Sequence, residues 1–189
     1  MRTPASPWAD ERCRAVRGEA LQYVANGWGV VPGSVWNGRR YTLGHCPSFV
    51  DGLVPVTLSG RTLRSAREVW SWWSVAPYGV LIRAEEDVAV LTAPRSLVVR
   101  ALKRHHPAIR RCPVILGPFG ARLLVSRQTP LRKELRDDLL VGMMPATSCV
   151  ALPPTKVPAG SLSWLRDPSE LGYRPGNADA VQIALVDAL

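Results

Sequence analysis

A dense run of basic side chains between residues 95 and 136 is the part of the sequence best suited to bind an anion. It holds eleven basic residues and one carboxylate, Glu134, in a chain whose formal net charge is +9. The basic residues are Arg95, Arg100, Lys103, Arg104, Arg110, Arg111, Arg122, Arg127, Arg132, Lys133 and Arg136. Such a block attracts phosphate backbones, and it equally fits a solvated surface that keeps the chain in solution. If the block binds phosphate, the candidate contacts to nucleic acid are Arg122, Arg100, Lys103, Arg104, Arg110 and Arg111.

Carboxylates and histidines with the chemistry to hold a metal are grouped at three places. Residues 85–87 are three consecutive acids, whose side chains diverge in a turn, so we expect a solvated turn. His105 and His106 follow one another at the end of an expected helix, where neighbouring side chains point about 100° apart and suit joint ligation poorly. We expect them to interact with the helix C-terminus instead. His45 and Cys46 do not complete a four-ligand zinc site.

Three tryptophans close together in the sequence offer faces on which the bases of a single strand could stack. Trp70 and Trp73 fall on the apolar face of an expected helix, so we predict that both lie in the core. Trp72 points away from them and is the candidate for a base contact.

The bulk properties predict a globular, cytoplasmic protein. The chain has 189 residues, 47% of them hydrophobic, which supports one good core arranged in one or two lobes. No apolar run reaches the roughly 18 residues that a membrane span needs, and no secretory signal is readable at the N-terminus. The four cysteines are widely spaced, without a C-x-x-C pair, which favours reduced thiols over a zinc finger or a disulfide framework.

The pattern of apolar residues and breakers predicts an α/β or α+β domain with a mixed sheet. A helix begins at Ser6–Pro7 and stops at Asn26–Gly27, a second is capped by Thr62, and a third begins at Ser96. Residues 33–61 are expected to form a long loop with at most a hairpin. Strands are expected over residues 28–32, 79–82, 88–91, 114–116, 122–125 and 149–152, and a short helix over 178–189.

Four segments, in order, resemble motifs of the actinobacterial and phage primase–polymerase domain of the archaeo-eukaryotic primase superfamily. They are Ala20–Pro32 (with Ala-Leu-x-Tyr and Gly-Trp-x-Val-x-Pro), Val69–Val80 (with Trp-Trp and Pro), Val150–Thr155 (Val-Ala-Leu-Pro-Pro-Thr) and Gly160–Trp164. The resemblance covers most of the chain. It implies an α/β lobe and a sheet lobe that resembles an RNA-recognition fold, with flanking helices, over residues 1–165. Residues 166–189 would then be a C-terminal tail with a short helix.

The resemblance also implies where catalytic residues would stand, and this sequence departs from the family at each position. The family strand Leu-Asp-Val-Asp-Pro, whose aspartates hold divalent metals, is similar to Leu91–Arg95, so that Thr92 and Pro94 stand at the aspartate positions. Neither residue binds a hard cation as a carboxylate does. The family histidine that contacts nucleotide phosphate corresponds to Arg122. A third acidic position falls at Gly142, with its arginine neighbour at Met144; Asp137 and Asp138 lie near enough to take its place.

The expected function is a catalytically degenerate primase–polymerase-like module that binds or regulates, a pseudoenzyme of DNA replication without the Mg²⁺ or Mn²⁺ of the family. Its partner would be DNA or a nucleotide, or another protein. Arg122 would bind phosphate or would be an ordinary surface arginine. Two alternatives stay open: an active nucleotidyltransferase whose metals are held by displaced ligands (Glu85, Asp87 and Asp138), and a protein–protein scaffold.

Overall fold

The computed structural model describes residues 7–44, 46–48, 50–57, 61–84, 88–118, 120–127, 129–137 and 140–189. The chain forms two units, one of Met1–Ile82 with Ala151–Leu162 and one of Arg83–Val150 with Ser163–Leu189. Each unit is therefore built from two separate stretches of chain. The expected division at residue 165 does not coincide with this, because residues 163–189 belong to the second unit. None of the described helices is long and apolar enough to cross a membrane.

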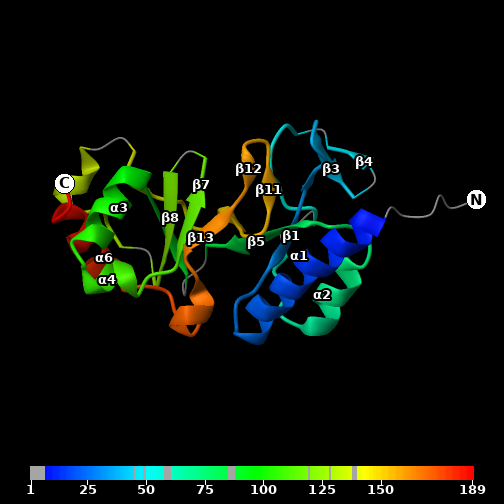
Figure 1. Ribbon diagram of the computed structural model, residues 1–189, viewed down its shortest axis with the longest axis horizontal. Helices are drawn as coiled ribbons and strands as arrows, with labels where there is room; N and C mark the ends of the chain where they lie inside the picture. Colours follow the sequence, from blue (N-terminus) through cyan, green and yellow to red (C-terminus); the bar gives the residue numbers. More distant parts are fainter. Residues whose placement is uncertain are drawn as a thin grey trace, which may run out of the picture. The chain divides into compact units, whose positions relative to one another are not determined.

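The first unit combines two helices with short antiparallel strands (Figure 1). Its helices are α1 (Pro7–Ala25) and α2 (Ala66–Trp73), which contact each other. Its strands are β1 (Val31–Gly33), β2 (Val35–Trp36), β3 (Tyr41–Leu43), β4 (Cys46–Pro47), β11 (Lys156–Val157) and β12 (Gly160–Ser161). Strands β5 (Gly79–Arg83) and β10 (Cys149–Leu152) lie where the chain passes from one unit to the other. The sheet orders are β1-β5-β10, β2-β3-β4 and β11-β12. Strands β2, β3 and β4 thus form a three-stranded sheet within residues 33–61, where a long loop with at most a hairpin was expected.

Helix α2 begins three residues later than the cap at Thr62 predicted. Ser65 is the N-cap: its Oγ accepts from the Glu68 amide at 3.3 Å and donates to the Glu68 carboxylate at 2.8 Å. This is a capping-box arrangement, in which the cap and the residue three positions later bind each other. The capping-box pattern is visible in the sequence as Ser65 followed by Glu68. The cap was predicted three positions earlier, at Thr62, which is also a typical N-cap residue.

The prediction that Trp70 lies in the core is wrong, whereas that for Trp73 is confirmed. Trp73 is fully buried and its Nε1 donates to the Tyr78 carbonyl at 2.8 Å. Trp70 is 50% exposed, with the Arg17 guanidinium 3.8 Å from its ring centroid. The buried residues of α2 are Val69 and Trp73, four apart, so the buried stripe runs through that pair and leaves Trp70 at its border. Trp72 packs edge-on against Tyr78.

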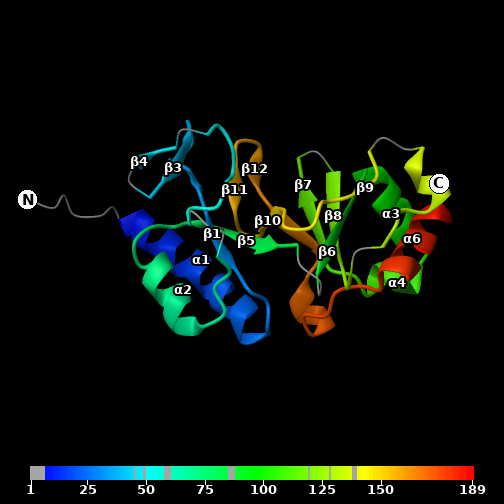
Figure 2. The same ribbon diagram turned by 180° about the vertical axis from the view of Figure 1, so that it is seen from behind.

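The second unit is a five-stranded sheet with helices on one of its faces (Figures 1 and 2). Its strands, in sheet order, are β13 (Ser163–Arg166), β7 (Val114–Gly117), β8 (Gly120–Val125), β6 (Ala89–Ala93) and β9 (Gly142–Met143). Its helices are α3 (Arg95–Lys103), α4 (Pro107–Arg110), α5 (Lys133–Arg136), η1 (a 3₁₀ helix, Pro168–Leu171) and α6 (Ala178–Val186). From β6 to β9 this is a β-α-β-β-α-β succession, with β6 and β8 in the middle of the sheet, as in ferredoxin-like domains.

The core of the second unit lies between the sheet and its helices. Ala89, Leu91 and Ala93 of β6 are buried in it together with Leu97 of α3 and Leu185 of α6. The C-terminal helix α6 is therefore an integral part of this core, because its apolar residues are buried there.

The α+β class is confirmed, and the described strand pairs are antiparallel. Where a mixed sheet was expected, the parallel component among the described residues is an isolated bridge between Val125 and Gly176. The connections explain this: β7 and β8 are joined by a tight hairpin, which can only pair neighbours antiparallel.

Candidate functional site

Three positions lie in one row across three neighbouring strands. They are the ones that the family resemblance assigns to the first aspartate, the histidine and the third acid. Thr92 on the central strand β6 is directly opposite Arg122 on β8 and directly opposite Gly142 on β9. Side chains directly opposite each other in neighbouring strands lie on the same face of a sheet. Because Leu91 and Ala93 point into the helical core, Thr92 and Arg122 lie on the face without helices.

The hydroxyl of Thr92 is already engaged by its neighbour. Its Oγ1 donates to the Gly142 carbonyl at 3.0 Å. A Cβ added at Gly142 would lie 3.5 Å from the same Oγ1, an ordinary van der Waals contact. The Thr92 hydroxyl therefore stabilises the β6–β9 pairing, and the row has space for a side chain at position 142.

Arg122 is half-buried and has no hydrogen-bond or ion-pair partner among the residues that the structure describes. Burial lowers the pKa of its guanidinium from the ordinary value, although an arginine stays charged at neutral pH. Its other cross-strand neighbour is Ile115 on β7, which is fully buried. A charge removed from water without a partner is costly, so an anion that reached Arg122 would offset that cost with charge-assisted hydrogen bonds.

Pro94 stands where β6 passes into α3. It is the N-cap residue of that helix, with φ −57° and ψ 138°, and no side-chain group caps the helix there. Proline fixes φ near this value and suits the start of a helix. The second aspartate position of the family is thus occupied by a residue that serves the strand-to-helix turn.

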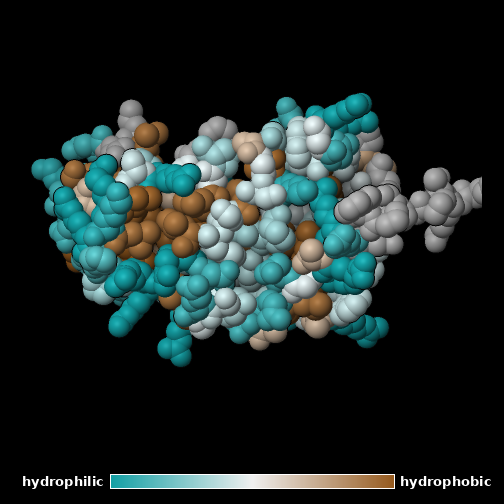
Figure 3. All heavy atoms as spheres, viewed as in Figure 1, coloured by the Kyte–Doolittle hydropathy of each residue, from teal (hydrophilic) through white to brown (hydrophobic). Residues whose placement is uncertain are grey.

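The other basic candidates lie apart from Arg122, in the helices that cover the opposite face of the sheet. Arg100 donates from Nε to the Ala188 carbonyl at 2.8 Å and so fixes the end of the chain. Lys103 and Arg104 lie exposed at the end of α3, and Arg110 and Arg111 lie exposed at α4. In the view of Figure 3, hydrophilic residues lie along the outer edge of the second unit, around an area of hydrophobic residues. The predicted set is therefore divided between two faces of the second unit.

The segments that carry the resemblance are joined to one another by buried hydrogen bonds in the first unit. The Tyr23 hydroxyl donates to the Pro153 carbonyl at 2.7 Å. Thr155 Oγ1 accepts from the Val80 amide at 2.8 Å and donates to the Val80 carbonyl at 3.1 Å. The Leu162 amide donates to the Thr155 carbonyl at 3.0 Å. These motifs thus have structural roles in this chain.

Several candidates from the sequence cannot be placed. Residues 85–87, His45 and Asp138 lie outside the described residues. Within the described part of the chain, no group of three or more histidine, cysteine, aspartate or glutamate side chains is arranged to hold a metal ion. Asp137 is exposed after α5, and all four cysteines are free thiols.

Arg174 was not singled out from the sequence, and the fold places it with Arg111 in the lining of one pocket. The two residues are far apart in the sequence, and a lone arginine in a loop carries no local signal. The packing of α6 against α4, with Arg174 in the loop before α6, brings them together.

Comparison of the chain with protein-family models, with curated proteins and with solved structures gives no match.

Proposed function

We propose that this chain is a primase–polymerase-like domain that binds the phosphate of a nucleotide or nucleic acid through Arg122 and transfers no nucleotidyl group. The observation that carries the proposal is the row formed by Arg122, Thr92 and Gly142. These positions were assigned one by one from short motifs in three separate stretches of sequence. Nothing in that assignment required them to be neighbours, and a chance alignment would scatter them over the fold.

The chemistry of the row favours binding over turnover. Two-metal phosphoryl transfer needs carboxylates that hold two ions a few ångströms apart. The row holds a hydroxyl bonded to a backbone carbonyl, a guanidinium, and a glycine without a side chain. A guanidinium fits two phosphate oxygens at once and keeps its charge at neutral pH, which histidine does not.

The test is a titration of the protein with dATP, single-stranded DNA and duplex DNA at two salt concentrations. We expect Arg122→Gln to weaken binding of the preferred ligand about tenfold, the effect of losing one charge-assisted contact. If the ligand is a nucleic acid, the slope of log K against the logarithm of the salt concentration should also fall by about one, the contribution of one phosphate contact. Arg104→Gln is the matched control, because it removes one exposed arginine from the other face and should change the affinity by less than about twofold.

Three results would contradict the proposal. Equal losses in Arg122→Gln and Arg104→Gln would mean that the overall charge, and not the row, attracts the ligand. Primer extension by the purified protein with Mg²⁺ or Mn²⁺, abolished by Asp138→Asn, would identify an active enzyme with displaced ligands. Absence of binding to all three ligands would leave the scaffold hypothesis as the better account.

A further inference from the structure

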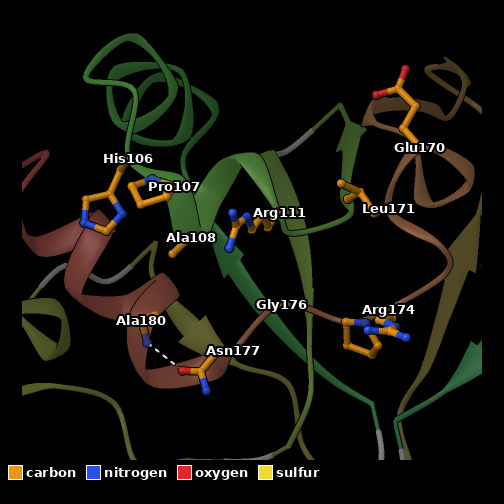
Figure 4. A pocket seen from close by; sticks show the side chains of 11 residues that line it. His106, Pro107, Ala108, Arg111, Glu170, Leu171, Arg174, Gly176, Asn177 and Ala180 are labelled. Carbon is orange, nitrogen blue, oxygen red and sulfur yellow. Dashed lines mark hydrogen bonds between the residues drawn. The ribbon is translucent and has the colours of Figure 1, made fainter.

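The second unit contains an open pocket of about 630 Å³ on its helical side (Figure 4). Its wall on one side is His106 with Pro107 and Ala108 of α4, and its other walls come from η1, the loop after it and the first turn of α6. Pockets that hold small molecules typically measure 300–1,000 Å³. The volume is thus sufficient for a small organic ligand.

The floor of the pocket is fixed to the sheet by backbone contacts. Gly176 donates to the Leu124 carbonyl at 2.9 Å and accepts from the Ser126 amide at 2.8 Å. A Cβ at Gly176 would lie 2.8 Å from both Cβ and Sγ of Cys112, so only glycine allows the loop to approach this closely. Asn177 caps α6, accepting from the Ala180 amide at 2.9 Å. The pocket is therefore shaped by the folded core and does not depend on a ligand to form.

The charges of the lining leave two positive groups without partners. Within the described part of the chain, the side chains of Arg111 and Arg174 have no hydrogen bond or ion pair. The carboxylate among the lining residues belongs to Glu170, whose Oε2 lies 3.2 Å from Nη1 of Arg166. In Figure 4 this carboxylate points away from the centre of the pocket. The amino end of the α6 dipole adds a partial positive charge. An anion entering here would meet two guanidinium groups that no described side chain neutralises.

The remaining lining is largely apolar. Its apolar side chains are Pro107, Ala108, Leu171, Pro175 and Ala180, and beside the charged residues it also contains His106, Gly176 and Asn177. An apolar wall beside two cationic groups is the arrangement expected for a ligand with an apolar body and a charged end. An elongated nucleic-acid backbone would need a track of cations, whereas this lining places two in one hollow.

We propose that this pocket binds a small phosphomonoester with an apolar or aromatic body, whose phosphate is held by Arg111 and Arg174. Two guanidinium groups are matched in charge by a phosphate dianion, and each can form paired hydrogen bonds with its oxygens. The body of the ligand lies against Pro107 and Leu171. This site is on the helical side of the sheet, so it is independent of the proposed role of Arg122.

The proposal is tested with phenyl phosphate as the probe, by calorimetry and by amide chemical-shift mapping. We expect saturable binding that perturbs amides of residues 106–111 and 171–180. Inorganic phosphate should bind about tenfold more weakly because it lacks the apolar body, and phenol should not bind. Arg111→Gln and Arg174→Gln should each raise the Kd about tenfold, the usual effect of one lost charge-assisted contact.

Arg104→Gln is the control variant and should leave the Kd within about twofold. All three arginines are exposed, so each variant is expected to fold, which its thermal unfolding midpoint verifies. The proposal is overturned if phenyl phosphate does not bind at millimolar concentration. It is equally overturned if the three variants lose affinity alike, or if the shifts centre on strands β6 and β8 and disappear in Arg122→Gln.

Discussion

Thr92 and Arg122 face each other from neighbouring strands of the second unit, at positions that the family resemblance assigns to a metal ligand and a phosphate contact. The Thr92 hydroxyl donates to the Gly142 carbonyl on its other side and leaves Arg122 without a partner among the described residues. The side chain at position 92 therefore contributes to strand pairing, and the one at position 122 remains free to bind an anion.

Replacing Thr92 by valine should destabilise the protein modestly. Valine keeps the shape of threonine but leaves the Gly142 carbonyl without its hydroxyl donor, at a cost of about 1 kcal/mol. Urea unfolding measures the difference. Thr92→Ser keeps the hydroxyl and should retain that bond. If valine proves as stable as threonine, the hydroxyl does not support the β6–β9 pairing.

Introducing two carboxylates into the row should create a divalent-metal site. Positions 92 and 142 are directly opposite, and a Cβ at Gly142 meets ordinary contacts. Carboxylates introduced together at these positions would face each other across about 5 Å, close enough to share a cation. We expect Thr92→Asp/Gly142→Asp to bind Mn²⁺ at least tenfold more tightly than either single variant, as measured by electron paramagnetic resonance. Equal affinity in all three variants would show that the two side chains do not converge.

Thr155 should be one of the most sensitive polar residues of the first unit. Its hydroxyl satisfies both the amide and the carbonyl of Val80, whose cross-strand neighbour, Pro32, has no N–H to donate. Thr155→Val leaves two buried groups unsatisfied and should lower the free energy of unfolding by about 3 kcal/mol. Thr155→Ser retains the hydroxyl and should cost about 1 kcal/mol for the lost methyl. Similar losses in the two variants would attribute the effect to packing alone.

Cys112 should make the stability depend on pH under alkaline conditions. Burial raises the pKa of its thiol from 9.0 to about 12. Between these values the unfolded thiol loses its proton while the folded thiol keeps it, so this contribution is fully present below pH 9. It then declines by about 1.4 kcal/mol per pH unit up to about pH 12. Urea unfolding of the protein and of Cys112→Ala, compared at pH 8, 9.5 and 10.5, isolates this contribution from the other groups that titrate there. Parallel pH profiles would contradict it.

Most of the local structure of this protein is readable from short stretches of its sequence. The first helix ends near Gly27, which adopts a positive φ of 86°, and apolar runs mark strands β5, β6 and β8. These features depend on neighbouring residues, whose backbone preferences and alternation are readable in a short window. The motifs also indicated the positions of Thr92, Arg122 and Gly142 along the chain.

How those positions are arranged relative to one another follows from the folding of distant segments onto each other. The strand order places Arg122 and Gly142 on either side of Thr92, and it separates Arg122 from the basic residues of α3 and α4. The same packing exposes Trp70 and brings Arg174 into the pocket with Arg111. Such relationships join residues tens of positions apart, and they are set by which apolar faces bury each other. No short window of sequence contains that information.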